Sequence, residues 1–267
     1  MTSKTHVIIL CGGISKRWNN YLGIEKHFTK IEGISVIEHI INLLLNFDVV
    51  ITILARQDNA QLFFNLNQSV FTISKEKSIM EFYKIKSTFD LWNNYGKTII
   101  LMGDVWYTYN AIKKILMSKT TCLQFWGRQR KNYHTKCRHG ELFAISFYPN
   151  SHDKIKKASD ILEDMILEQE IKIAGGWGIY NIISGLDNLM SKEKIIKGKA
   201  LFSNFNNILD VTDDIDTPND YENIKQALSV NKLTKIINSL KMYFFYFFIT
   251  IYNIYYELIS TFRNKII

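Results

Sequence analysis

Residues 6–17 read HVIILCGGISKR, in which an apolar run ends at two glycines and is followed by a serine and an arginine. The short run of aliphatic residues predicts a buried strand. The two glycines predict a tight turn whose backbone N–H groups can closely approach an anion. The stretch lacks the GK[ST] of a P-loop and the third glycine of the dinucleotide fingerprint. An ordinary strand-to-helix turn is the alternative reading at this point.

The rest of the chain continues with apolar strands and amphipathic helices. We predict further strands at residues 49–54, 70–74, 98–102, 121–126 and 141–148, and helices at residues 35–47, 79–92, 111–117 and 153–170. Strands that are apolar throughout and alternate with helices are typical of a parallel sheet covered on both faces. We therefore expect an α/β fold with a Rossmann-like, three-layer α/β/α arrangement around a mostly parallel sheet.

Length and composition limit the classes of protein that fit. The 267 residues suggest one large domain at residues 1–230 and a hydrophobic, aromatic helical tail at residues 231–267. A hydrophobic fraction of 47% and a charged fraction of 22% exclude wholesale disorder and collagen. The three cysteines are scattered and have no zinc spacing, so we expect a reducing compartment. Because the apolar run at residues 7–10 is too short for a signal peptide, the expected location is cytoplasmic.

The net charge of +8 fits a phosphorylated substrate, an anionic membrane or a nucleic acid. A compositional bias towards lysine, asparagine and isoleucine explains the charge equally well. The charge alone therefore does not choose between these partners.

Three later segments carry candidate functional side chains. Lys26 is placed to reach a polyphosphate, although a lone lysine is more often simply solvated. Asp104 follows the strand predicted at residues 98–102 and Gly103, where it can hold a divalent metal or cap a helix. Asp216-Thr217-Pro218 predicts a helix start with Thr217 as N-cap, inside an aspartate-rich loop that a cation can neutralise.

Taken in order, these segments resemble the nucleotidyltransferase superfamily, which has a GT-A-like fold. The family pattern is LxGGxSxR, a downstream lysine, a strand ending in GD, and a late DxDTPxDY or DxDTPxDL, and the resemblance covers about residues 5–228. It implies transfer of a nucleoside monophosphate from an NTP to a phosphorylated acceptor, with release of pyrophosphate. The implied roles are nucleotide binding by Leu10, Cys11, Gly12, Gly13, Ser15, Arg17 and Gly103, catalysis by Arg17 and Lys26, and binding of Mg²⁺ by Asp104 and Asp216.

The sequence departs from the family pattern at two positions. Cys11 replaces the usual alanine, and Glu25 replaces the usual proline before the lysine. A carboxylate beside Lys26 would weaken an anion site unless it points away. We therefore keep a catalytically degenerate nucleotide-binding protein as one alternative.

The motif variants also bear on the substrates. The GGxSxR form is similar to that of molybdenum-cofactor guanylyltransferases and cytidylyltransferases, which favours CTP or GTP. The chain length and the late TDDIDTPNDY segment look like those of cell-surface-polysaccharide and viral relatives. The resemblance therefore implies a sugar phosphate or phospho-alcohol as acceptor, in the synthesis of surface glycan precursors. A GT-A glycosyltransferase is the other enzymatic alternative, but such enzymes usually carry a DxD pair where this chain has Asp104-Val105-Trp106.

The acceptor side is less specified. Residues 126–139 are strongly basic with interleaved aromatic side chains, and we take Arg128 and Arg130 as candidate acceptor-binding residues. The same mixture suits a solvated loop or a nucleic acid surface, although we expect no nucleic acid partner. The stretch Gly175-Gly176-Trp177-Gly178 predicts a flexible loop, with Trp177 as a further candidate for the acceptor pocket.

The tail differs from the rest of the chain. Residues 242–256 read MYFFYFFITIYNIYY and carry no charge. The run is shorter than the roughly 20 apolar residues of a membrane-spanning helix. Residues 240–262 are therefore predicted either to lie at a membrane surface or to pack against the domain or a second subunit as a homo-oligomer contact.

Overall fold

The computed structural model describes residues 4–172, 174–186 and 204–263, with side chains described as far as residue 251. Within these residues the central sheet has seven strands, and β9 runs antiparallel to both of its neighbours while the other pairs are parallel. This confirms the predicted mostly parallel sheet. In sheet order the strands are β10 (Phe205–Asn207), β8 (Gln124–Arg128), β9 (Glu141–Phe147), β6 (Thr98–Met102), β1 (Thr5–Cys11), β4 (Val49–Arg56) and β5 (Ser69–Ile73).

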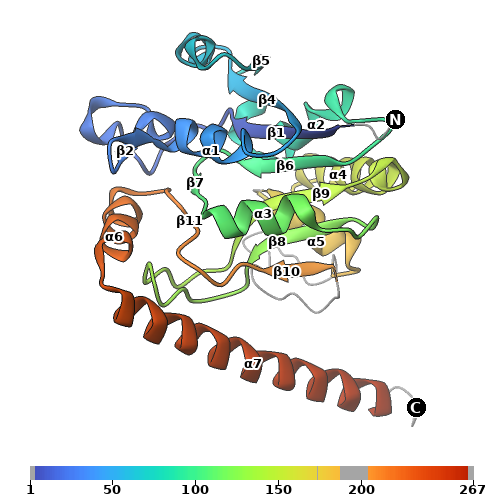
Figure 1. The fold of residues 1–267 in the computed structure, drawn as a ribbon. Helices are drawn as coiled ribbons and strands as arrows, with labels where there is room; N and C mark the ends of the chain where they lie inside the picture. The colour runs from blue at the N-terminus through green and yellow to red at the C-terminus, as the bar shows by residue number, and fades with distance from the viewer. Residues whose placement is uncertain (1–3, 173, 187–203, 264–267) are drawn as a thin grey trace.

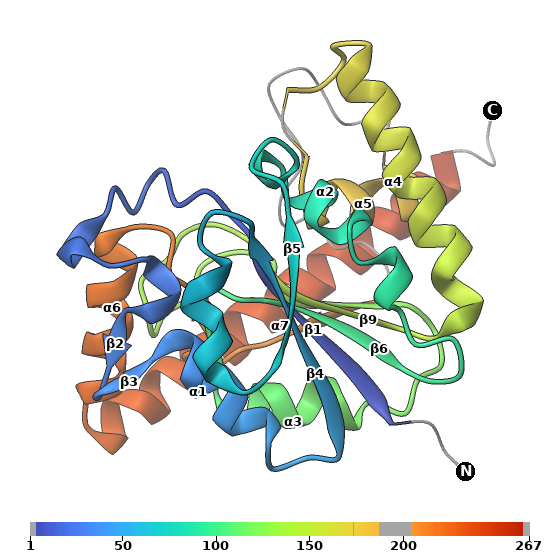
Figure 2. The same cartoon turned by 90° about the horizontal axis from the view of Figure 1, so that it is seen from above.

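Helices cover both faces of the sheet, as predicted (Figures 1 and 2). One face carries α1 (Val36–Leu44) and α3 (Tyr109–Met117), and the other carries α2 (Glu81–Lys86), α4 (His152–Leu167) and α5 (Gly176–Ile183). The α1 helix begins at a capping box between Ser35 and Glu38, which satisfies backbone donors of its first turn. Its apolar residues at helical spacing are buried against the sheet. The core therefore lies on both sides of strands β1 and β6, whose central residues are fully enclosed.

Short elements bring distant segments together at one edge of the sheet. The ribbon β2 (Lys30–Ile31) and β3 (Ile34–Ser35) leads into α1, and β7 (Val105–Trp106) pairs antiparallel with β11 (Asp213–Asp214). The second pairing lays the late aspartate-rich segment beside the end of β6. The 3-10 turns are η1 (Tyr21–Gly23), η2 (Lys26–Phe28), η3 (Ala60–Leu66), η4 (Lys77–Ile79), η5 (Phe89–Leu91) and η6 (Pro149–Ser151).

The late helix start was predicted correctly. Helix α6 (Pro218–Ser229) begins with Thr217 as N-cap, Pro218 in the first turn, and a capping box closed by Asp220. The preceding Asp216 is therefore held at a fixed helix entrance.

Three predictions about local structure were wrong in detail. The helix predicted at residues 79–92 is interrupted: α2 ends at Lys86, and the Thr88 hydroxyl donates to the Ile85 carbonyl, which competes with helix continuation. The strand predicted at residues 121–126 lies at Gln124–Arg128. The flexible loop predicted at 175–178 is instead the start of α5, where Gly176 N–H donates to the Glu81 carboxylate at 2.8 Å.

The C-terminal helix α7 (Lys232–Arg263) starts ten residues before the uncharged run and lies along the outside of the domain (Figure 1). In the part of the chain that the structure describes, no helix is long and apolar enough to cross a membrane. Residues 264–267 of the predicted tail lie outside the described residues.

Candidate nucleotide and metal site

The carboxyl ends of β1 and β6 meet at one edge of the sheet. These strands run in register with Leu10 opposite Met102, and Gly103 N–H donates to the Leu10 carbonyl at 3.0 Å. A Cβ at Gly103 would lie 2.5 Å from Cys11 Sγ and 2.7 Å from the Leu10 oxygen, so this close approach requires glycine. The side chains of Leu10 and Cys11 are buried in the core. Leu10, Cys11 and Gly103 were all predicted to bind the nucleotide. Because their side chains are buried, Leu10 and Cys11 can offer a ligand only their backbone groups.

The glycine turn after β1 is flanked by two basic residues that sequence reasoning missed. Arg56 Nη1 donates to the Gly13 carbonyl at 2.8 Å, and the Lys84 ammonium lies 3.2 Å from the position of a Cβ at Gly13. Arg56 is the last residue of β4, which runs parallel beside β1. Its place at the carboxyl end of a strand was a usable signal, because ligands of parallel sheets bind there. Lys84 lies on α2 and gave no such signal, since only the packing of that helix brings it here.

Four of the predicted site residues converge on one another. Lys26 Nζ lies 2.6 Å from Asp104 Oδ2 and 3.2 Å from Asp216 Oδ1, and the Arg17 guanidinium forms an ion pair with the other oxygen of Asp216. The Lys26 side chain is only 7% exposed, whereas Arg17 is 67% exposed. The structure thus joins residues from the first loop, the turn after β6 and the entrance of α6.

The pairing of β7 with β11 explains this convergence. Ile215 N–H donates to the Asp104 carbonyl at 2.8 Å, directly beside the paired strands. The backbone just before Asp216 is therefore fixed against Asp104, which brings the two aspartate side chains close together. No local sequence pattern predicts this antiparallel contact between segments so far apart in the chain.

The charges in this cluster stabilise one another. Burial alone would lower the pKa of Lys26, but the adjacent carboxylates of Asp104 and Asp216 raise it above its ordinary value. Burial would likewise raise the pKa of Asp104, but Lys26, with a smaller contribution from His27, holds it well below its ordinary value. Lys26 is therefore a cation and Asp104 an anion at neutral pH.

Further carboxyl groups crowd the same edge. The pKa of Asp214 is raised well above its ordinary value by burial, then by Glu141, Asp216, Asp213 and Asp104. Cys137, Glu141 and Asp214 also place potential ligand atoms within 4.8 Å of one another. This second group was not predicted from the sequence. Burial and the neighbouring carboxylates therefore disfavour the charged form of Asp214.

Glu25, the residue that departs from the family pattern, turns towards the first loop. Its carboxylate accepts a hydrogen bond from Ser15 Oγ at 3.2 Å and lies 3.6 Å from His27 Nδ1. Burial acts to raise the pKa of Glu25, but His27, Arg56 and Ser15 together lower it below its ordinary value. The ion pairs of Lys26 are with Asp104 and Asp216. Glu25 therefore orders Ser15 and leaves the Lys26 ammonium to the two aspartates.

Aromatic packing holds the far side of the first loop. Trp18 is 1% exposed, its Nε1–H donates to the Ile24 carbonyl at 2.9 Å, and its ring meets Tyr21 and Tyr221 edge to face. Tyr221 belongs to α6 and also donates its hydroxyl to the Lys30 carbonyl. Between this wall and β4 lies a hollow of about 240 Å³, lined by Ile14, Ser15, Lys16, Trp18, Asn19, Asn20, Ile24, Glu25 and Arg56.

The candidate acceptor-binding residues lie in different surroundings. Arg128 is fully buried, and its two terminal nitrogens donate to Asp213 and to the carbonyls of Arg130 and His139, so these nitrogens serve the fold. Trp177 is 5% exposed and stacks on Phe205 at 5.2 Å. Arg130 is exposed. The structure therefore leaves Arg130 as the one of these three that is open to a ligand.

No protein-family model matches this chain, and no curated protein matches it by sequence. Solved structures do match. The inositol-1-phosphate CTP transferase from T. maritima superposes with a TM-score of 0.56 at 12% identity, over 86% of this chain and 98% of that one. The CTP:phosphocholine cytidylyltransferase from Streptococcus pneumoniae gives 0.55 at 12% identity, over 85% and 100%.

This chain has the nucleotidyltransferase fold. A glucose-1-phosphate thymidylyltransferase described as putative, from Bacillus anthracis, gives a TM-score of 0.54 at 12% identity, over 85% of this chain and 96% of that one. Likeness at such identities establishes the fold, while an activity has to be argued from the site. The expected fold class is thereby confirmed.

Proposed function

We propose that this protein is a Mg²⁺-dependent nucleotidyltransferase, which transfers a nucleoside monophosphate from an NTP to a phosphorylated sugar or alcohol and releases pyrophosphate. The observation that carries this proposal is the Lys26 ammonium held between Asp104 and Asp216 at the carboxyl edge of the sheet. An anion-binding glycine turn, a buried lysine and two converging carboxylates are the parts that phosphoryl chemistry needs.

The two aspartates fit a magnesium ion. Asp104 and Asp216 reach the same ammonium from separate loops, so their oxygens already converge. Mg²⁺ prefers hard oxygen ligands and is commonly held by one or two carboxylates together with waters and substrate phosphates. Crowding of Asp214 by neighbouring carboxylates also favours an added cation. When bound, the ion would neutralise phosphate charge and make the α-phosphorus more electrophilic.

The chain's own groups would then position the reactants. Backbone N–H groups of Gly12 and Gly13 would donate hydrogen bonds to the triphosphate, and the planar guanidinium of Arg17 would form bidentate hydrogen bonds with its oxygens. Lys26 would balance the charge that develops on the phosphates. An oxygen of the acceptor phosphate attacks the α-phosphorus, the bond to the α–β bridging oxygen breaks, and that oxygen leaves with pyrophosphate. Because the acceptor phosphate is already ionised, positioning and charge stabilisation supply most of the rate.

The substrate class follows from the motif variant and from the structural comparison. We propose CTP or GTP as donor and a sugar phosphate or phospho-alcohol as acceptor, in the synthesis of a surface glycan precursor. The solved structures with this fold support the coarse class, since they include transferases that use CTP and are named for inositol 1-phosphate and phosphocholine. Arg130 is our candidate for contact with the acceptor phosphate.

The test is pyrophosphate release with Mg²⁺ and each of the four NTPs, against a pool of sugar 1-phosphates and phospho-alcohols. We expect release with one NTP, its loss with EDTA, and its loss in Asp104→Asn. The asparagine of that variant retains a side-chain oxygen that can accept a hydrogen bond from Lys26, so we expect the fold to be kept. Asp164→Ala, on the exposed side of α4, is the matched control and should keep full activity.

Other outcomes would contradict the proposal. Release of a nucleoside diphosphate from a nucleotide sugar would indicate a glycosyltransferase. NTP binding that raises the melting temperature, with no pyrophosphate release across the whole panel, would indicate a degenerate binding protein. Full activity in Asp104→Asn would overturn the metal assignment.

A further inference from the structure

Helix α7 is attached to the domain through one face. Met242 is fully buried and Tyr246 is 5% exposed. The Tyr246 hydroxyl accepts a hydrogen bond from the Arg130 backbone N–H at 3.0 Å, and Tyr133 N–H lies 3.3 Å from Met242 Sδ. The Phe245 ring meets Tyr133 edge to face. The helix is therefore anchored on the loop that follows β8.

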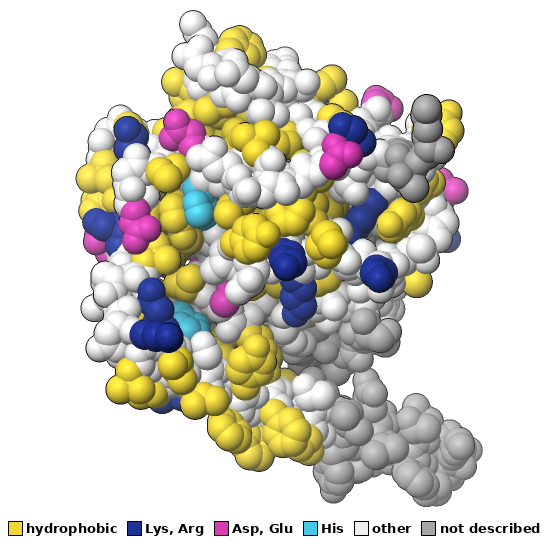
Figure 3. Space-filling model, viewed as in Figure 1, with side chains coloured by type: hydrophobic (Ala, Val, Ile, Leu, Met, Phe, Trp, Pro, Cys, Tyr) yellow, Lys and Arg dark blue, Asp and Glu magenta, His cyan; other side chains and the backbone are white. Residues whose placement is uncertain are grey.

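The opposite face of α7 is apolar and exposed. Its residues recur every three or four positions, which puts them on one side of the helix over an arc of roughly 140° at 100° per residue. Scattered exposed apolar residues are normal, but a continuous stripe of this length marks an interaction surface. We call it the apolar stripe; it consists of Leu233, Ile236, Ile237, Leu240, Tyr243, Phe244, Phe247, Phe248 and Ile251, each 42–66% exposed. Figure 3 shows yellow side chains along the lower edge of the molecule, where α7 lies.

Positive charge borders the apolar stripe. From Lys232 to Ile251 the helix carries lysines and no acidic residue. The anchoring loop adds the exposed basic side chain of Lys131, whose ammonium lies 4.6 Å from the centre of the Tyr133 ring. We call Lys232, Lys241 and Lys131 the basic border; the two α7 lysines lie about 20° outside the two edges of the apolar stripe.

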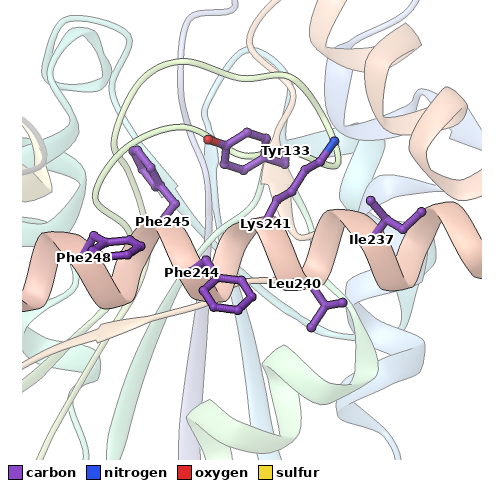
Figure 4. Close-up of a pocket in the computed structure, with 7 residues that line it drawn as sticks. All are labelled: Tyr133, Ile237, Leu240, Lys241, Phe244, Phe245 and Phe248. Atoms are coloured by element: carbon purple, nitrogen blue, oxygen red, sulfur yellow. The ribbon is translucent and has the colours of Figure 1, made fainter.

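A shallow groove joins the two features. It holds about 400 Å³ and is walled by rings of α7 and by Tyr133 of the loop. In Figure 4 the Lys241 side chain extends beside the Tyr133 ring, while Phe245 and Phe248 lie further along the helix. An apolar groove with an ammonium beside it suits an acyl chain whose headgroup carries a phosphate.

We propose that α7 lies flat on an anionic phospholipid bilayer, with the apolar stripe inserted at the headgroup level and the basic border against the lipid phosphates. Broad aromatic faces flanked by lysines are characteristic of interfacial helices. The stripe is wider than the two positions per heptad that line a coiled-coil seam. A second copy of the chain on this face would bring the same basic border against itself, whereas an anionic surface is complementary to it. Because the other face of α7 holds the domain, this docking would place the catalytic domain at the membrane surface.

The experiment is co-sedimentation of the full chain with vesicles of 70% phosphatidylcholine and 30% phosphatidylglycerol, beside vesicles of phosphatidylcholine alone. We expect binding to the anionic vesicles that weakens as salt is raised. The variant Phe244→Ser, Phe247→Ser, Phe248→Ser should lose binding about tenfold or more, because it removes inserted aromatic area. The control Leu62→Ser, Phe64→Ser, Phe71→Ser removes three other exposed apolar side chains, 47–59% exposed, from elsewhere on the domain and should bind as the wild type does.

Circular dichroism of each variant checks that the fold is kept, and light scattering gives the mass of each protein. Absence of binding by the wild type to anionic vesicles would overturn the proposal. The proposal would also be overturned if the wild type were a dimer that fails to bind vesicles and the α7 triple variant were a monomer. In that case the apolar stripe would be the contact with a second copy of the chain. Equal loss of binding in both triple variants would also overturn it.

Discussion

Replacing Lys26 with methionine should make the free protein bind Mg²⁺ more tightly while it abolishes turnover. The Lys26 ammonium contacts the two carboxylates that we assign to the metal. It therefore competes with the ion for Asp104 and Asp216. Methionine keeps the length of the buried stem and removes the competing charge.

The size of the effect follows from the geometry. Unit charges about 4 Å apart interact by about 4 kcal/mol at an effective dielectric constant of 20. The side chains of Asp104 and Asp216 are 28% and 23% exposed, so water already screens part of this energy. We expect a net gain of about 1.4 kcal/mol in Mg²⁺ binding, which is about tenfold in affinity.

Isothermal titration of Mg²⁺ into the nucleotide-free variant measures this directly. A larger rise in melting temperature with Mg²⁺ than the wild type shows should accompany it. Lys30→Met, at an exposed lysine nearby, controls for the general loss of one positive charge. Unchanged or weaker Mg²⁺ binding in Lys26→Met would refute the placement of the metal between the two aspartates.

Three further predictions concern the fold and the thiols. Arg128→Met should lower the free energy of unfolding in urea by about 4 kcal/mol, because it leaves Asp213 buried without its cation. An unchanged midpoint of urea unfolding, together with a raised KM for the acceptor, would show that Arg128 instead reaches the substrate. Gly103→Ala would place its methyl carbon 2.7 Å from a β1 carbonyl oxygen, so thermal unfolding should show a loss of about 2 kcal/mol, and a stability equal to the wild type would contradict the close approach. Iodoacetamide at pH 8 should label exposed Cys122 about tenfold or more faster than Cys137, because burial and then Asp213 raise the pKa of the Cys137 thiol to about 11. Equal labelling rates of the two cysteines, measured by mass spectrometry, would contradict this expected difference.

Local patterns predicted the framework of the fold and the positions of the site residues along it. The apolar run before Gly12 forms β1, an interior strand of the sheet, and Thr217 and Pro218 start a helix because capping chemistry is encoded within a few residues. Asp104 lies just after β6, as its place behind an apolar run indicated. Each of these features depends on neighbours in the sequence.

What the sequence could not predict depends on distant contacts. Arg128 looked like a surface ligand within a basic stretch, but Asp213 draws it into the interior. The glycines around Trp177 suggested flexibility, yet a Cβ at Gly176 would lie 2.3 Å from a Leu142 methyl group, so glycine there permits close packing of α5. Such contacts join segments far apart in the sequence, and the local pattern of one segment does not predict its contact with the other.

The most direct test of the central claim follows phosphorus labels through a single reaction. With ³²P at the α position of the preferred NTP, the account predicts that the label appears on the acceptor. With ³²P at the γ position, it predicts that the label appears in pyrophosphate. A γ-label found on the acceptor, or an α-label that never leaves the nucleotide pool while the other products form, would contradict nucleotidyl transfer.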